Sequence, residues 1–131
     1  MTKFNSNGET LIFKEIPNTH EIEGVMFGIF REDGTKLGET FCRNDKFNGL
    51  AWYLDDIFIE PEYQGNNYGS QLLEKTCEAL WQKKKKLDII LERPSNAIAP
   101  NGFDRKAWYE RHGFTPHSNP EITYMWREPP S

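Results

Sequence analysis

Glycine and amide residues are concentrated in the stretch YQGNNYGSQLL, Tyr63–Leu73, directly before apolar residues at helical spacing. The amides of a first helical turn have no carbonyl partner within the helix, and the helix dipole favours negative charge there. Gly65 and Gly69 let the backbone adopt a positive φ and come close to a ligand, and Asn67 tolerates the left-handed region better than most residues. The stretch is therefore either a phosphate-binding loop or an ordinary loop that caps a helix.

The two common nucleotide-binding patterns do not fit this stretch. No Gly-Lys-Ser/Thr follows it, which excludes the Walker pattern, and the spacing of Gly65 and Gly69 does not match the dinucleotide fingerprint. The elements on either side of the loop must therefore decide between the two interpretations.

The first half of the chain is typical of antiparallel strands. Apolar and β-branched residues are concentrated in Glu9–Ile16, Gly24–Glu32, Lys36–Arg43 and Leu50–Ile59. Asp33-Gly34 is a dipeptide that tight hairpin turns prefer, and Pro17 and Pro61 end the first and last of these runs. We expect about four strands here, paired in sequence order.

The second half changes to a helical period. From Tyr68 onward, one buried helical face is formed by Leu72, Leu73, Thr76, Cys77, Leu80 and Trp81. Lys83–Lys86 closes this helix, either as a solvated last turn or as a group that attracts an anionic cofactor. Leu87–Glu92 is a short apolar strand, so strand, helix and strand form a βαβ-type unit around the loop. A second helix is expected between an Asp104 N-cap and a Gly113 stop, and a last strand in Glu121–Glu128.

Composition limits the class of protein. A chain of 131 residues with 14% aromatics suits one domain, 1–131, with a packed core. No apolar run approaches the roughly 18 residues of a membrane span, and the N-terminal MTKFNSNGE lacks the apolar core of a signal peptide. Cys42 and Cys77 are no disulfide framework, so we expect a reducing, cytoplasmic setting without a membrane. The net charge of −4 argues against nucleic acid as the main partner and weakly favours a cationic acceptor.

Two motifs in this order resemble those of the GNAT family of N-acetyltransferases. IEPEYQGNNYGSQLL, Ile59–Leu73, resembles the family's cofactor-binding motif, Gln/Arg-x-x-Gly-x-Gly/Ala after a strand that ends in apolar-x-Pro-Glu-Tyr. Gln64 and Gly69 match this motif, whereas Asn67 stands in place of its middle glycine. KAWYERHGF, Lys106–Phe114, resembles the second signature, an aromatic-Tyr-x-x-x-Gly-Phe segment that ends the following helix.

The resemblance spans roughly Leu50–Phe114 and implies a fold. This is an α/β (α+β) GNAT-like fold with flanking helices on a mixed, largely antiparallel central sheet of about six or seven strands. Members usually place two helices, which line the acceptor pocket, between their first and second strands. Only Pro17–Glu23 is available here, so we expect those helices to be shortened or missing. Acceptor recognition is then reduced or supplied from elsewhere, for example by the second subunit of a homodimer.

The resemblance also implies acetyl-CoA (coenzyme A) as the cofactor. In the family the loop amides hold the pyrophosphate, the pantetheine arm follows the preceding strand, and a strand amide steadies the thioester oxygen. An asparagine often contacts the pantetheine arm, and here either Asn96 or Asn101 fits. The cofactor-binding residues implied are Phe58, Ile59, Gln64, Gly65, Asn66, Asn67, Tyr68, Gly69, Ser70 and Asn101.

Three side chains are candidates for catalysis by the same resemblance. Tyr109 matches the tyrosine that in many members protonates the departing thiolate, and its alternative is a core aromatic beside Trp108. Asp55 and Asp56 lie on the strand before the loop, where some members hold a carboxylate that deprotonates the amine directly or through water. Neighbouring strand residues point to opposite faces, so at most one should face the reaction centre. The similarity of YLDDIFI to the Leu-Glu-Asp segment of diamine acetyltransferases favours Asp55; alternatively, both carboxylates are solvated or pair with surface lysines.

The remaining candidates carry no assigned chemistry. His20, His112 and His117 are dispersed with no carboxylate or cysteine at metal spacing, so we expect structural or surface roles and no metal. Both cysteines are expected in the core. The resemblance therefore implies an N-acetyltransferase that moves an acetyl group from acetyl-CoA directly to a primary amine of a small molecule or peptide. The alternative is a regulatory module of the same fold that binds CoA and acetylates nothing.

Overall fold

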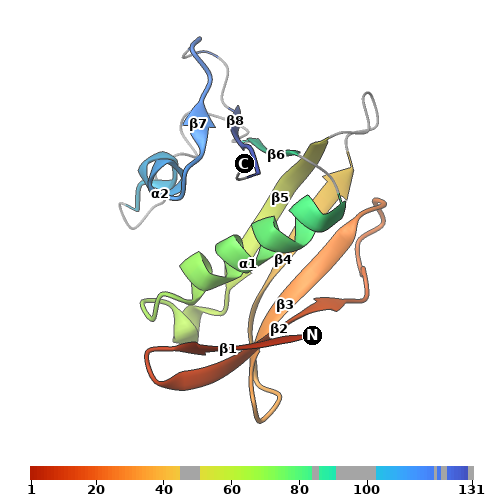
Figure 1. Cartoon of the computed structure of the whole chain (residues 1–131), viewed down its shortest axis with the longest axis vertical. Coiled ribbons are helices and arrows are strands. Elements are labelled where there is room, and N and C mark those ends of the chain that lie inside the picture. Colours follow the sequence, from red (N-terminus) through yellow and green to blue (C-terminus); the bar gives the residue numbers. More distant parts are fainter. Residues whose placement is uncertain (45–50, 84–85, 91–102, 120, 122–123, 130–131) are drawn as a thin grey trace.

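A single eight-stranded sheet organises the computed structural model, which describes residues 1–44, 51–83, 86–90, 103–119, 121 and 124–129. The strand order is β1-β2-β3-β4-β5-β6-β8-β7 (Figure 1). The strands are β1 Thr2–Ser6, β2 Glu9–Ile16, β3 Val25–Arg31, β4 Lys36–Asn44, β5 Ala51–Ile59, β6 Lys86–Ile90, β7 Thr115–Pro116 and β8 Tyr124–Arg127. The helices are the 3₁₀ turn η1 Pro61–Tyr63, α1 Tyr68–Lys83 and α2 Arg105–Arg111. The expected α+β fold with a mixed, largely antiparallel sheet is confirmed, and the sheet has more strands than expected.

The strands of the first half pair in sequence order, each antiparallel to the next. The hairpin expected at Asp33-Gly34 is present, with Thr35 N donating to Asp33 Oδ1 at 2.9 Å. Strand β1 was missed by the sequence analysis. It returns to β2 through Asn7-Gly8, whose positive φ angles of 52° and 81° are those that a tight hairpin turn requires.

A β-bulge in β5 changes which face its side chains take. Cys42 of β4 opposes Leu54, whereas Phe41 opposes Asp56, so Asp55 is the extra residue on β5. Leu54 lies in the buried core. After the bulge, the odd-numbered Ile57 and Ile59 pack against that core, and Asp56 shares the opposite face of the sheet with Phe41.

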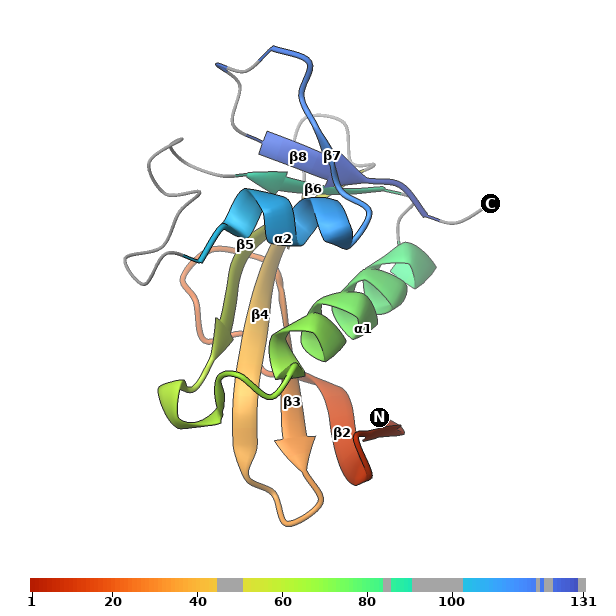
Figure 2. The ribbon, with the colours of Figure 1, turned by 90° about the vertical axis from the view of Figure 1, so that its left-hand side faces the viewer.

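Strands β5 and β6 are parallel but separate after a short stretch. Residues Ala51–Leu54 of β5 pair with Lys86–Ile89 of β6. Beyond Leu54, β5 continues to Ile59 with β4 as its only partner among the described strands. Figure 2 shows β6 and β8 crossing the upper end of β5 instead of running alongside it. Among the described strands, none therefore pairs with the second edge of β5 beyond Leu54, and we call this edge the open edge of β5.

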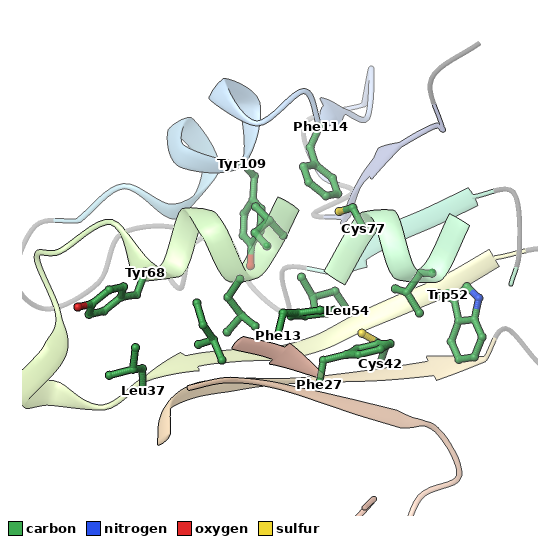
Figure 3. Close-up of a cluster of buried hydrophobic side chains, with 14 of the residues drawn as sticks. Phe13, Phe27, Leu37, Cys42, Trp52, Leu54, Tyr68, Cys77, Tyr109 and Phe114 are labelled. Carbon is green, nitrogen blue, oxygen red and sulfur yellow. The ribbon is translucent and has the colours of Figure 1, made fainter. Parts of the chain in front are cut away.

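Both helices pack on one face of the sheet. The buried residues of α1 form one hydrophobic cluster with residues of the strands beneath it, and Tyr109 of α2 and Phe114 join this cluster (Figure 3). Cys42 and Cys77 lie in it, as expected. Asp104 caps α2 by accepting a hydrogen bond from Ala107 N at 3.0 Å, and Gly113 follows the helix with φ 83°. Among the described residues, no helix is long and apolar enough to cross a membrane.

The segment between β2 and β3 is irregular. From the sequence, we expected the helices that usually follow the first strand to be shortened or missing here. Residues 17–24, between β2 and β3, contain no helix, which confirms that expectation. The side chain of Asn18 donates to Ile22 O at 3.0 Å and to Gly24 O at 3.3 Å. His20 stacks on Phe41 with ring centroids 3.9 Å apart. This segment therefore covers part of the sheet face that points away from α1.

Candidate active site

The loop between β5 and α1 has two residues in the left-handed backbone region. Gly65 has φ 87° and Asn67 has φ 66°, whereas Gly69, for which a positive φ was also expected, lies in α1 and does not have one. The side chain of Gln64 donates to Ile59 O at 3.0 Å, and that of Asn66 donates to Tyr63 O at 3.1 Å. Asn67 thus holds the conformation that a glycine would otherwise hold, because its short polar side chain tolerates that region. The departure from the family motif preserves the backbone shape.

The amides at the start of α1 are available to a ligand. The first helical hydrogen bond is donated by Gln71 N to Asn67 O at 3.3 Å, so the amides of Tyr68, Gly69 and Ser70 have no partner within the helix. The first turn of α1 contains no acidic residue.

The space beside the loop is open as well. A Cβ atom added at Gly65 would meet no atom within 4 Å, and one added at Gly69 would only touch Ile59 Cγ1 at 3.7 Å and Trp108 Cζ2 at 3.8 Å. Donor groups, a favourable dipole and free space all suit a pyrophosphate, so the residues present fit the phosphate groups of acetyl-CoA.

Tyr68 anchors this loop to the N-terminal strands. Its side chain is 5% exposed, and its hydroxyl donates to Glu9 Oε2 at 2.7 Å. Arg31 Nε donates to Glu9 Oε1 at 2.8 Å, and the guanidinium lies 4.9 Å from the centre of the Tyr63 ring. The hydrogen bonds from Tyr68 and Arg31 hold the pKa of the Glu9 carboxyl below its usual value. The Tyr68 side chain therefore points away from the ligand space, and only its amide can serve the cofactor.

The open edge of β5 brings the other predicted cofactor contacts next to the loop. Ile59 ends the strand and lies beside Gly69, and Phe58 is 41% exposed. Backbone groups along the unpaired edge can pair with an extended ligand as a neighbouring strand would. The amides of the pantetheine arm are groups of that kind. Asn96 and Asn101, the alternative contacts to this arm, lie outside the described residues.

Tyr109 projects from α2 into the core, and its hydroxyl points toward the sheet (Figure 3). The residue is 6% exposed, and its ring lies 5.0 Å from the Trp108 ring and 5.5 Å from the Phe114 ring. Burial raises the pKa of the Tyr109 phenol well above its ordinary value, and the charge of Asp56 raises it further. Tyr109 is thus a core aromatic that also carries a neutral, proton-donating hydroxyl within the electrostatic reach of Asp56.

The two aspartates of β5 have different surroundings. Asp55 forms an ion pair with Arg43 through both guanidinium nitrogens Nε and Nη2, and Arg43 lies over the Tyr53 ring. Asp56 forms no such pair among the described residues; burial and then the neighbouring Glu39 raise the pKa of its carboxyl. Both aspartates lie on the face opposite α1, so the alternation expected of a regular strand fails at the bulge. Asp55, which the resemblance favoured, is thus held in an ion pair, and Asp56 is the carboxylate without such a pair among the described residues.

One contact of the loop had no counterpart in the sequence analysis. His112, at the end of α2, lies 3.0 Å from Ser70 Oγ through Nε2 and 2.9 Å from Glu74 Oε2 through Nδ1. His112 is 42 positions from Ser70 and 38 positions from Glu74, so no local pattern could connect them.

In the described part of the chain, no three His, Cys, Asp or Glu side chains meet as metal ligands would.

A family model described as an acetyltransferase (GNAT) domain matches residues 23–116. The chain belongs to the GNAT acetyltransferase family. Acetyl-CoA is the acyl donor of this family, so the chain is an acetyl-CoA-dependent acyltransferase. The matched region includes both segments on which the resemblance rests, Ile59–Leu73 and Lys106–Phe114.

Three solved structures with the same fold are similar to this chain over almost their whole length. The IAA acetyltransferase of Bacillus cereus ATCC 14579 has a TM-score of 0.65 at 14% identity, covering 91% of this chain and 99% of the other. A GNAT acetyltransferase of Elizabethkingia anophelis with acetyl-CoA bound has a TM-score of 0.63 at 13% identity, covering 91% and 98%. AtaT complexed with acetyl-methionyl-tRNAfMet has a TM-score of 0.63 at 9% identity, covering 90% and 94%. A sequence search of curated proteins gave no match.

Proposed function

We propose that this GNAT protein transfers an acetyl group from acetyl-CoA directly to a primary amine of a small molecule or peptide. The observation that carries the proposal is that three groups lie along or beside β5, with Asp56 close enough for its charge to act on the Tyr109 phenol. These are the free amides of Tyr68–Ser70, the neutral phenol of Tyr109 and the carboxylate of Asp56. A similar structure with acetyl-CoA bound supports acetyl-CoA as the acyl donor.

Each group has one role in the proposed reaction. The amides of the loop hold the pyrophosphate, and the backbone of β5 orients the pantetheine arm. Bound acetyl-CoA supplies a thioester that a neutral amine can attack, so that a C–N bond forms and the C–S bond breaks. Asp56 accepts the proton that the ammonium form of the acceptor must lose, directly or through water. Tyr109 donates its proton to the leaving sulfur and takes up, directly or through water, the proton that the attacking nitrogen loses as the amide forms.

The acceptor side of the site favours a cationic amine. Asp56 and Glu39 are close enough for each charge to act on the other, and Phe58 adds an exposed aromatic surface on the same strand. The net charge of −4 disfavours a polyanion, although the similar AtaT structure holds an acetylated aminoacyl-tRNA. We therefore rank small amines and peptide N-termini above tRNA. A homodimer and a cytoplasmic location remain predictions from the sequence.

A CoA-thiol release assay tests this proposal. The acceptor panel contains polyamines, amino acids, aminoglycosides, peptide N-termini and an aminoacyl-tRNA, and the mass of the product identifies the acetylated group. We expect thiol release above hydrolysis with at least one amine of the first four classes. Release with aminoacyl-tRNA alone would replace the proposed acceptor class. CoA binding without release on the whole panel would instead support the regulatory module.

A further inference from the structure

His112 connects the phosphate-binding end of α1 to the helix that carries Tyr109. Its ring lies between Ser70 Oγ at 3.0 Å and Glu74 Oε2 at 2.9 Å, both on α1. Arg127 of β8 holds the same carboxylate, with Nη1 at 2.8 Å from Glu74 Oε2 and 3.0 Å from Oε1. The His112 side chain is 19% exposed. The imidazole is thus held at both nitrogens in one orientation.

The partners of the ring determine which nitrogen carries a proton. An ionised carboxylate only accepts hydrogen bonds, so Nδ1 of His112 must be the N–H that faces Glu74. In the neutral ring, Nε2 is then an acceptor, and the Ser70 hydroxyl must donate its hydrogen bond to it. In that state Ser70 can offer a phosphate oxygen only lone pairs, which is unfavourable.

Protonation of the ring reverses this arrangement. In the imidazolium form, Nε2–H donates to Ser70 Oγ, so the Ser70 hydroxyl is free to donate to an anion beside the first turn of α1. A positive charge also comes close to that turn. Both effects favour a bound pyrophosphate, and neither is available when the ring is neutral.

We propose that His112 is a positioning residue of the phosphate site, which turns Ser70 into a donor toward the pyrophosphate of CoA when the imidazole is protonated. The proposal rests on the proposed function, because it takes the loop to hold CoA. It gives His112 a role in place of the structural or surface role that its sequence suggested. Affinity for the ligand must then fall as pH rises through the titration of the ring.

The charged and titratable groups around the ring are consistent with this role. On α1 these groups are Glu74 and Cys77, and burial raises the pKa of the Cys77 thiol to about 12, so it stays neutral at physiological pH. On β8 the group is Arg127, whose charge balances that of Glu74. On α2 the Trp108 ring lies 5.0 Å from the imidazole and carries no charge. Titration of His112 therefore changes the net charge of this cluster by one unit.

The test measures the affinity of 3′-dephospho-CoA by calorimetry between about pH 5.5 and 8.5, the range in which histidine titrates. This ligand lacks the 3′-phosphate, whose second ionisation near pH 6 would obscure the result, and keeps the pyrophosphate. We expect affinity to fall roughly ten- to hundredfold across this range, the effect of about one charge-assisted hydrogen bond. The variant His112→Gln should bind with the same affinity at every pH. His117→Gln, in the β7–β8 connection, is the matched control and should behave as the wild type does.

A second measurement does not depend on any variant. The ring protons of His112, followed by NMR in the free protein and with dephospho-CoA, should titrate at higher pH in the bound state, since linkage is reciprocal. A pH-independent affinity in the wild type, an unchanged titration of the ring, or binding of CoA but not of dephospho-CoA would each overturn the proposal for His112. Failure of CoA itself to bind at any pH would instead overturn the proposed function.

Discussion

Replacing Tyr109 by Phe should separate catalysis from stability. The residue is 6% exposed, and its ring packs against Trp108 and Phe114. Removing only the hydroxyl oxygen keeps this packing, so the free energy of unfolding should change by no more than about 1 kcal/mol. Loss of a general acid should nevertheless lower kcat by about 10²–10⁴-fold, or roughly 3–5 kcal/mol of transition-state stabilisation.

Tyr68→Phe is the matched control, because it removes an identical oxygen from another buried tyrosine. The Tyr68 hydroxyl donates to Glu9 at 2.7 Å, so its loss should lower the free energy of unfolding by about 1–2 kcal/mol. This is at the low end for a hydrogen bond to a charged group, because the Glu9 carboxylate keeps its Arg31 partner. Its kcat at saturating acetyl-CoA should stay within about threefold of wild type, because the side chain points away from the reacting groups.

The assay combines denaturant unfolding, calorimetric affinity for acetyl-CoA and CoA-thiol release with the best amine. We expect Tyr109→Phe to be stable, to bind the cofactor normally and to turn over slowly. Equal turnover in Tyr109→Phe and wild type would remove Tyr109 from the mechanism. A large loss of stability in that variant would show that the hydroxyl has a structural partner.

Three further predictions concern the loop and the base. Asn67→Gly should keep or raise the free energy of unfolding and tighten CoA binding. Asn67→Ala should lose about 1–2 kcal/mol in thermal unfolding, because φ is 66° at this position. Equal stability of the two variants would contradict the role of the left-handed backbone. Gly69→Ala should fold as stably as wild type, since the added methyl group meets only ordinary contacts at 3.7 and 3.8 Å, yet weaken CoA at least about tenfold by calorimetry if the ligand passes this point; unchanged affinity would move the ligand elsewhere. Because the pKa of the Asp56 carboxyl is raised and its base form exists only above that pKa, kcat/KM should rise with pH through a value above that of an ordinary aspartate. Asp56→Asn should abolish this rise, and an identical pH profile in that variant would assign the base to another group.

Features set by local sequence could be predicted, and the loop shows why. Gly65, Asn67 and the helix start at Tyr68 follow from turn-forming residues next to a helical period, and the structure has them as expected. Asp104 and Gly113 bound α2 for the same local reasons. Strand β1 could also have been predicted, because Asn7-Gly8 is a dipeptide that tight hairpin turns strongly prefer.

Features set by distant pairing could not be predicted. The bulge at Asp55 depends on how β4 and β5 align, so nothing in YLDDIFI shows that both aspartates share a face. The bond between Tyr68 and Glu9 joins residues 59 positions apart. The contacts of His112 with Ser70 and Glu74 likewise form only after α2 packs on α1. The bulge determines that both aspartates share a face, the Tyr68–Glu9 bond anchors the loop, and the His112 contacts are those on which the proposed role of Ser70 rests.

We expect acetyl-CoA to bind along the loop from Gln64 to Ser70 and the open edge of β5. An amide NMR titration of the isotope-labelled protein with acetyl-CoA tests this most directly, because it reports on each backbone N–H separately. We predict that the largest shifts occur at the amides of Gly65–Ser70 and of Asp56–Ile59. Saturable binding that leaves these amides unmoved, and shifts others instead, would contradict the account.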